Sequence, residues 1–97
     1  MEQLYKYTKY NQDGTVEDLG ISKQKSFKEL YKIIGCDTIE IIPPEYYENR
    51  RWSNCTVYGD EEGRFNTDNH VNPHFSELAP GWNVVGNTVK EEVVSNV

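Results

Sequence analysis

The first clear pattern along the chain is a period-two alternation over residues 4–10, rich in tyrosine and threonine. Such side chains suit a pleated, half-buried surface, so the segment predicts a strand. Asp13 and Gly14 follow, a pair that readily supplies the positive φ of a hairpin reversal, and residues 15–21 predict the returning strand. The chain is therefore expected to open with a β-hairpin.

A helix signal comes next. Ser26 and Glu29 have the Ser-x-x-Glu spacing of a capping box, in which hydroxyl and carboxylate satisfy free N–H groups of the first helical turn. Apolar side chains then recur at i, i+3, i+4 and i+7 as far as Ile34, and Gly35 is the residue type that ends helices in the left-handed conformation. We expect a helix over about residues 26–34, with one face packed on the sheet.

The middle of the chain predicts short strands. The β-branched run 39–42 is expected to be a buried strand, which two prolines end because proline cannot donate to a ladder. Residues 54–58 predict another strand. The acidic, glycine-flanked segment 59–63 is turn-forming, so residues 64–66 are expected to return as the second strand of that hairpin.

The last third of the chain predicts one more helix and two strands. Asn72 followed by Pro73 is a favourable cap and first helical residue, so a short helix is expected over about residues 73–79. Residues 82–85 and 88–94 predict the final strands. The order of elements becomes β-β-α-β-β-β-α-β-β, an α+β fold with a mixed or antiparallel sheet.

Composition narrows the class of protein. The 97 residues have room for a single domain, expected to cover residues 1–97, and 36% hydrophobic side chains exclude a disordered chain. A net charge of -6 disfavours polymeric nucleic acid as a partner. No stretch approaches the roughly 20 apolar residues of a membrane span, and the first ten residues lack the apolar run of a signal peptide. We expect a cytoplasmic protein of a bacterial cell that binds no membrane.

Neither a metal site nor an active site is indicated. Suitable residue types for zinc occur, but structural zinc sites pair cysteines two to four residues apart, whereas these lie on separate elements. The four residues are Cys36, Cys55, His70 and His74. The chain has no glycine-rich phosphate loop and no Ser/His/Asp or Cys/His signature, and the carboxylates at 60–62 are expected in a solvated turn. We therefore expect reduced cysteines, no metal or other cofactor, and no enzymatic activity.

One loop concentrates aromatic and basic side chains. Aromatic rings can stack on bases, and the arginine fork binds phosphate oxygens, so this loop is a candidate ligand site. Its candidate residues are Tyr46, Tyr47, Arg50, Arg51 and Trp52. In the alternative interpretation, Trp52 and one tyrosine pack in or over the core, and the arginines pair with Glu45 and Glu48 at the surface.

A polar cluster forms a second candidate wall of the site. The cluster consists of Asn69, His70, Asn72 and His74. Asparagine side chains can read a base edge, and the N-terminus of a helix that begins at Pro73 favours an anion. The alternative is structural, with Asn72 capping that helix and Asn69 forming a turn.

Three segments, in this order and spacing, resemble a family of small domains encoded by phages, plasmids and some bacterial genomes. They are Ile-Ile-Gly-Cys-Asp-Thr-Ile-Glu-Ile-Ile-Pro at 33–43, Val-Tyr-Gly-Asp-Glu-Glu-Gly-Arg-Phe-Asn at 57–66 with Asn72 downstream, and Val-Val-Gly-Asn at 84–87. The resemblance covers about residues 26–94, and each segment alone is a common junction or turn.

The resemblance implies a function in immune evasion. Several phage proteins of this size are sponges that sequester the cyclic nucleotide messengers of antiviral systems such as CBASS, without turnover and as homo-oligomers. By size and loop chemistry we expect such a sponge for a cyclic di- or oligonucleotide, as a homo-oligomer such as a tetramer. Tyr46, Tyr47 and Trp52 would stack, and Arg50 and Arg51 would neutralise phosphates. The alternative is a phage protein that inhibits a host protein by direct contact, with its acidic surface steering a basic partner.

Overall fold

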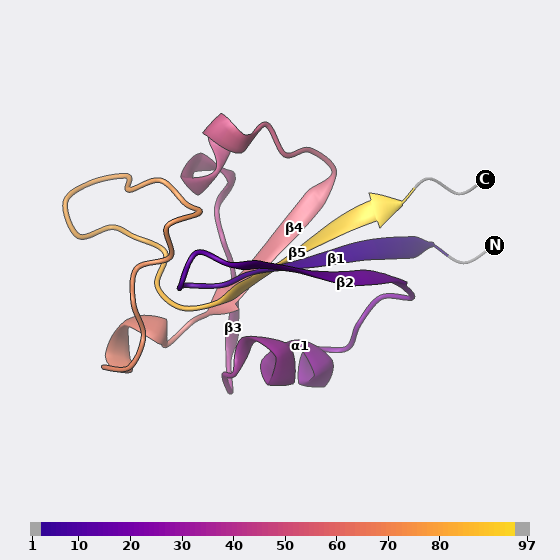
Figure 1. The fold of residues 1–97 in the computed structure, drawn as a ribbon, viewed down its shortest axis with the longest axis horizontal. Helices are drawn as coiled ribbons and strands as arrows, with labels where there is room; N and C mark the ends of the chain where they lie inside the picture. Colours follow the sequence, from indigo (N-terminus) through magenta and orange to yellow (C-terminus); the bar gives the residue numbers. More distant parts are fainter. Residues whose placement is uncertain (1–2, 95–97) are drawn as a thin grey trace.

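Five antiparallel strands form one sheet in the computed structural model, which describes residues 3–94 (Figure 1). The strands are β1 (Leu4–Tyr10), β2 (Val16–Ser22), β3 (Ile39–Ile41), β4 (Cys55–Asp60) and β5 (Thr88–Val94). They lie in the order β2-β1-β5-β4-β3, so the last strand in sequence occupies the centre of the sheet. Residues 1–2 and 95–97 of the expected domain lie outside the described residues. The structure is a small α+β domain, as expected.

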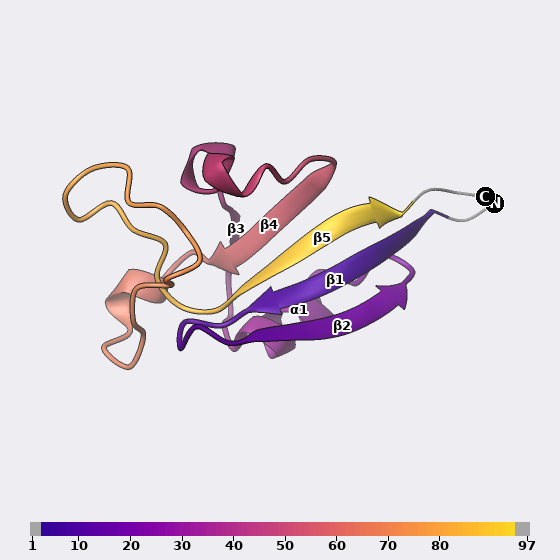
Figure 2. The same ribbon diagram turned by 45° about the horizontal axis from the view of Figure 1, so that its top comes forward.

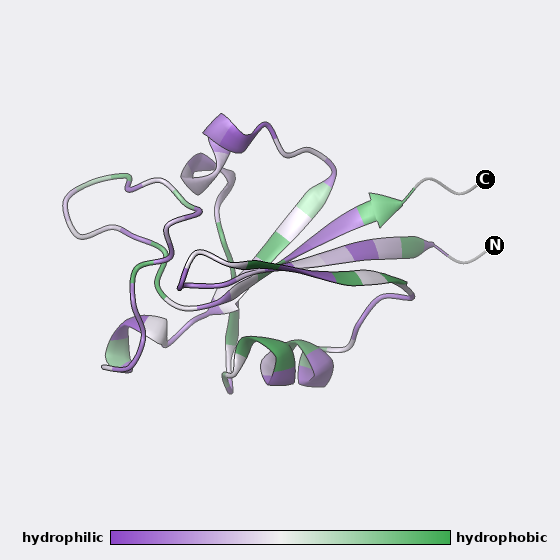
Figure 3. Ribbon diagram, in the orientation of Figure 1, coloured by the Kyte–Doolittle hydropathy of each residue, from purple (hydrophilic) through white to green (hydrophobic). Residues whose placement is uncertain are grey.

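Helix α1 (Phe27–Ile34) covers one face of the sheet. Its capping box forms as predicted, with the Glu29 backbone N–H donating to the Ser26 hydroxyl, and Gly35 ends the helix at φ 83°. Leu30 and Ile34 belong to one core cluster, completed by Tyr7, Tyr58 and Val89. Figure 3 shows apolar and polar residues alternating around α1. The predicted helix over residues 26–34 is confirmed.

Chain without regular strands lies on the side of the sheet away from α1 (Figure 1), and Figure 2 shows it around β3, β4 and the turn end of the β1–β2 hairpin. It contains the short 3-10 helices η1 (Pro44–Tyr46) and η2 (Glu48–Arg50), which follow β3. A second core cluster lies beneath, against which Trp52 and Cys55 pack. Its buried members are Tyr10, Ile42, Tyr46, Tyr47, Val57, Phe75 and Val84. Among residues 3–94, no helix is long and apolar enough to cross a membrane.

Three predicted elements are wrong. Residues 64–66 do not return as a strand, because the 3-10 helix η3 (Gly63–Phe65) turns the chain away from β4. Residues 82–85 form no strand and pair with the preceding loop through the single bridge between Val71 and Val85. Residues 73–79 form turns instead of a helix. The observed order is thus β-β-α-β-β-β with three 3-10 helices, and not the predicted one.

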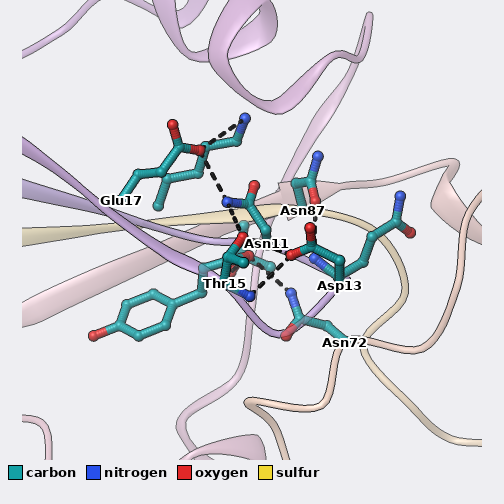
Figure 4. A network of polar contacts seen from close by, with 10 residues as sticks. Asn11, Asp13, Thr15, Glu17, Asn72 and Asn87 are labelled. Carbon is teal, nitrogen blue, oxygen red and sulfur yellow. Dashed lines mark hydrogen bonds and ion pairs between the residues drawn. The ribbon is translucent and has the colours of Figure 1, made fainter.

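Asn72 anchors the loop in which the second helix was expected to begin. Its side chain is fully buried and its amide donates to the carbonyls of Tyr10 and Gly86, both at 2.9 Å, while its oxygen accepts from the His74 N–H at 3.0 Å. These bonds hold the loop against the end of the β1–β2 hairpin. Figure 4 shows Asn72 beside the polar network of that hairpin turn, where the Gln12 N–H donates to the Asn87 side chain at 2.9 Å. The local cap bond to His74 thus forms, but no helix follows, because the Ser76 N–H donates to the Tyr46 carbonyl at 2.8 Å and not to the Asn72 carbonyl.

Candidate functional site

The two tyrosines of the predicted loop lie in the core. Tyr46 and Tyr47 are 8% and 6% exposed, and both belong to the cluster beneath η1 and η2. The Tyr47 ring lies 5.2 Å from Trp52 and 6.4 Å from Phe75, centre to centre. The alternative interpretation of this loop placed one tyrosine in the core. The structure places both of them there.

Trp52 is half-buried and contacts two cations of its own chain. The Lys90 ammonium lies 4.4 Å from the centre of the Trp52 rings, and the guanidinium carbon of Arg50 lies 5.6 Å away. The ring of Tyr10 packs on Trp52 at 4.8 Å. Burial alone would lower the pKa of Lys90, but hydrogen bonds to Tyr10 and Glu92 outweigh it and raise that pKa above its ordinary value. Lys90 is therefore a charged group that the fold keeps against Trp52.

Arg50 joins the two clusters that the sequence had kept apart. Its guanidinium donates to the His74 carbonyl at 3.3 Å and lies 3.0 Å from Nδ1 of the His74 ring. Since arginine has no acceptor, Nδ1 accepts this bond, which leaves the ring proton on Nε2. Nε2 is buried and has no hydrogen-bond partner among residues 3–94, and the Tyr10 ring packs edge-on against the imidazole at 5.1 Å. Arg51 is exposed and takes the left-handed conformation, with φ 56°.

The polar residues of the second predicted wall are structural in this fold. Asn72 is the buried clamp described above, and Asn69 donates to the Gly63 carbonyl at 2.9 Å, which ties the loop to η3. Of the eight predicted site residues, the structure brings Arg50, Trp52 and His74 together at the surface.

A hollow of about 400 Å³ lies between the paired strands β3 and β4 and the segment before β5, and its lining includes one of the predicted site residues, Tyr46. Its walls combine aromatic rings, carboxylates and one guanidinium, and we name it the Phe65–Trp82 hollow. The residues that give it this character are Glu40, Asp60, Glu61, Arg64, Phe65 and Trp82. Phe65 is 86% exposed and Trp82 is 57% exposed. Two large rings left open beside one hollow indicate a binding surface more strongly than scattered apolar residues do.

The charge inside the hollow is negative. Three carboxylates, from Glu40, Asp60 and Glu61, face a single guanidinium from Arg64. Burial raises the pKa of Glu40, and the neighbouring Glu61 and Asp60 raise it further, while Arg64 acts in the opposite direction. Arg64 is itself held in place, because it donates to the Asn83 carbonyl at 2.9 Å and stacks over the Trp82 ring at 5.4 Å. The arrangement suits a cation with an apolar stem.

Sequence reasoning missed this hollow for identifiable reasons. It assigned Phe65 and Trp82 to strands and the carboxylates at 60–62 to a solvated turn. The available signal was that each ring stands among polar, glycine or proline residues, which is typical of exposed loops. Their closeness depends on the bridge between Val71 and Val85, which no local pattern encodes.

The cysteines are free and half-buried, and burial raises the pKa of the Cys36 thiol to about 11. Within residues 3–94, no three His, Cys, Asp or Glu side chains are grouped so as to hold a metal ion. No family model, curated protein or solved structure matches this chain.

Proposed function

We propose that this chain is a binding protein that holds a basic side chain of a partner protein in the Phe65–Trp82 hollow. The observation that supports the proposal is the combination of two exposed rings with three carboxylates around one cavity. A Lys or Arg side chain can lay its methylene stem on the rings and its charge against the carboxylates. The role needs no chemical turnover.

Charge supports a basic partner at long range as well. The chain carries a net charge of -6, which steers basic surfaces toward it and increases their rate of association at low ionic strength. The stacking of Arg64 on Trp82 within the chain is a model for the contact, since the same ring surface already accepts one guanidinium. The acidic charge and the stacked Arg64 favour the alternative function, in which the protein binds a host protein directly and inhibits it.

Binding of a cyclic di- or oligonucleotide stays a prediction of the resemblance. The carboxylates of the Phe65–Trp82 hollow repel phosphates, so such a ligand would bind at Arg50 and Arg51 instead. Arg50 would have to exchange its bonds to His74 for the ligand. The homo-oligomeric state and the cytoplasmic location likewise stay predictions.

A titration with short blocked peptides tests the proposal. We expect Ser-Gly-Arg-Gly-Ser and its lysine counterpart to shift the Trp82 indole N–H signal in NMR spectra, with a weak affinity that falls as salt is added. Trp82→Ala and Glu40→Gln should weaken the binding, whereas Glu48→Gln, a charge change at an exposed residue outside the hollow, should not. A glutamate peptide that binds equally well would overturn the proposal. Cyclic dinucleotides, titrated in parallel, should shift the Trp52 signal only if the nucleotide prediction holds.

A further inference from the structure

β3 forms an open edge of the sheet. Within residues 3–94, β3 pairs with β4 alone. The Ile42 N–H donates to the Val57 carbonyl at 2.8 Å, so the backbone groups of Ile42 and, two residues earlier, of Glu40 face β4. By the alternation of an antiparallel ladder, the N–H and C=O groups of Ile39 and Ile41 face outward. An edge with such groups exposed can pair with an added strand.

The helix side of this edge is apolar. A groove of about 230 Å³ runs between α1 and the strands, and it is lined by Phe27, Tyr31, Ile39, Ile41 and Tyr58. Phe27 is 62% exposed and Ile41 is 64% exposed, although both stand beside core residues. We name this feature the helix-side groove.

The other side of the same edge is acidic. Glu40 lies between Ile39 and Ile41, so its side chain points to the opposite face and lines the Phe65–Trp82 hollow. One short strand thus presents apolar chemistry on one face and negative charge with aromatic rings on the other. A strand paired with β3 would meet both, because its successive side chains also point to opposite faces.

We propose that an extended segment of the partner protein adds to β3 as a further strand, with the side-chain pattern apolar–basic–apolar. The basic residue, opposite Glu40, enters the Phe65–Trp82 hollow, and the flanking apolar residues cover Ile39 and Ile41 in the helix-side groove. Backbone hydrogen bonds supply register, and the two faces supply specificity. The basic residue of this segment rests on the proposed function. The pairing with β3 and the apolar–basic–apolar pattern are added here.

A second copy of this chain fits the edge poorly. Antiparallel pairing of β3 with its own copy about a two-fold axis brings the two Glu40 side chains to one face, next to Asp60 and Glu61 of both copies. Like charges opposite one another on a sheet are destabilising. The other edge strand, β2, is less suited to pairing, because a bulge between Tyr7 and Thr8 breaks its register and Glu17 and Asp18 are exposed along it. The charges therefore select a basic partner at β3.

Backbone N-methylation of a blocked peptide, Ser-Val-Lys-Val-Ser, tests the pairing directly. The valines lie opposite Ile39 and Ile41, so their N–H groups face β3, while the lysine N–H faces solvent. N-methylation of one valine should weaken binding by about tenfold, through one lost hydrogen bond and a steric block. N-methylation of the lysine is the matched control and should leave binding unchanged. Isothermal titration at low salt measures all three peptides.

The outcomes separate the two proposals. Equal binding of both methylated peptides, with Trp82→Ala still abolishing binding, overturns the added strand and keeps the hollow as the site. Equal binding of Ser-Val-Glu-Val-Ser overturns the basic site itself. Ile41→Lys, at an exposed position, should weaken the valine peptide and spare Ser-Gly-Lys-Gly-Ser. Dimerisation in light scattering that Ile41→Lys abolishes would show that β3 pairs with a second copy, and would overturn the partner proposal.

Discussion

The ammonium of Lys90 lies 4.4 Å from the centre of the Trp52 ring system, in a pocket where only 6% of the lysine is exposed. With Arg50 also over the ring, Trp52 provides its aromatic surface to cations of the same chain. Trp82, by contrast, has one such intramolecular contact, from Arg64, and stands open at the hollow. Substitution of the two tryptophans should therefore have different effects on the stability of the protein.

We expect Trp52→Ala to lower the free energy of unfolding by about 3 kcal/mol, because it opens the core cluster and leaves the Lys90 charge without its ring. Trp82→Ala should change it by no more than about 0.5 kcal/mol, as an exposed residue does. Urea denaturation followed by circular dichroism measures both. Similar losses for the two variants would contradict this division between core and binding surface.

Asn72→Ala should cost about 2–3 kcal/mol. The change removes the Asn72 donor from the buried carbonyls of Tyr10 and Gly86, although Tyr10 keeps the longer bond from the Thr88 hydroxyl, and it frees the His74 N–H. Asn66→Ala is the matched control, since Asn66 is exposed and accepts a local bond from the Asp68 N–H. Denaturation of both variants in urea provides the comparison. An equal effect of the two substitutions would show that Asn72 is not a clamp.

Stability should fall at alkaline pH. Burial, reinforced by the Glu91 carboxylate, raises the pKa of Tyr58 to about 12, and burial also raises that of Tyr7, whose hydroxyl donates to Glu91 at 2.7 Å. The unfolded tyrosines titrate near about 10. The folded state thus holds the protons longer, so this contribution is complete below pH 10 and is lost as the pH rises from there toward 12.

The expected slope is at most about 1.4 kcal/mol per pH unit for each tyrosine. Urea denaturation between pH 8 and about pH 11 measures it, and Tyr58→Phe should reduce it, because phenylalanine has no proton to lose. The difference between the variant and the parent removes the contribution of lysines that titrate in the same range. A slope that is the same in both would refute the role of Tyr58.

Gly63→Ala should lower stability by about 2 kcal/mol and weaken binding at the Phe65–Trp82 hollow. A Cβ at Gly63 would lie 2.8 Å from the Val85 carbonyl oxygen, so the backbone of η3 and that of the facing segment must separate. Gly59→Ala is the control. Its Cβ would meet the end of the Ile42 side chain, also at 2.8 Å, and the end of a side chain can shift more readily than a backbone carbonyl. A larger loss for Gly59→Ala, in thermal unfolding, would contradict the argument.

Local signals in the sequence predicted the elements that are built from local interactions. The Ser26 and Glu29 capping box, the Gly35 stop and the alternation in β1 need no information from distant residues. The elements that were predicted wrongly are those whose structure depends on contacts with residues far away in the sequence. Asn72 is an intrinsically good cap, yet its side chain bonds to Tyr10, 62 residues away, and no helix begins there.

The candidate site shows the same limit. The sequence places arginines and aromatic residues in one loop, but it could not show that Arg50 contacts Trp52 and His74 of the same chain. Phe65 and Trp82 are separated by a loop without regular secondary structure, and only the fold places them at one hollow. Residue types in the sequence predicted which kinds of side chain make contacts, such as arginine with an aromatic ring. They did not predict which residues contact one another.

The central position of β5 has a consequence for synthesis on the ribosome. β1 and β2 pair as one hairpin and β3 and β4 as another, and within residues 3–94 these two hairpins are joined in the sheet through β5 alone. Before Thr88 to Val94 have emerged from the ribosome, the nascent chain therefore contains two strand pairs that are not joined in one sheet. Tyr7 and Val57 are then still exposed to water. Completion of the sheet therefore waits for this late segment, which inserts between two strands that come earlier in the chain.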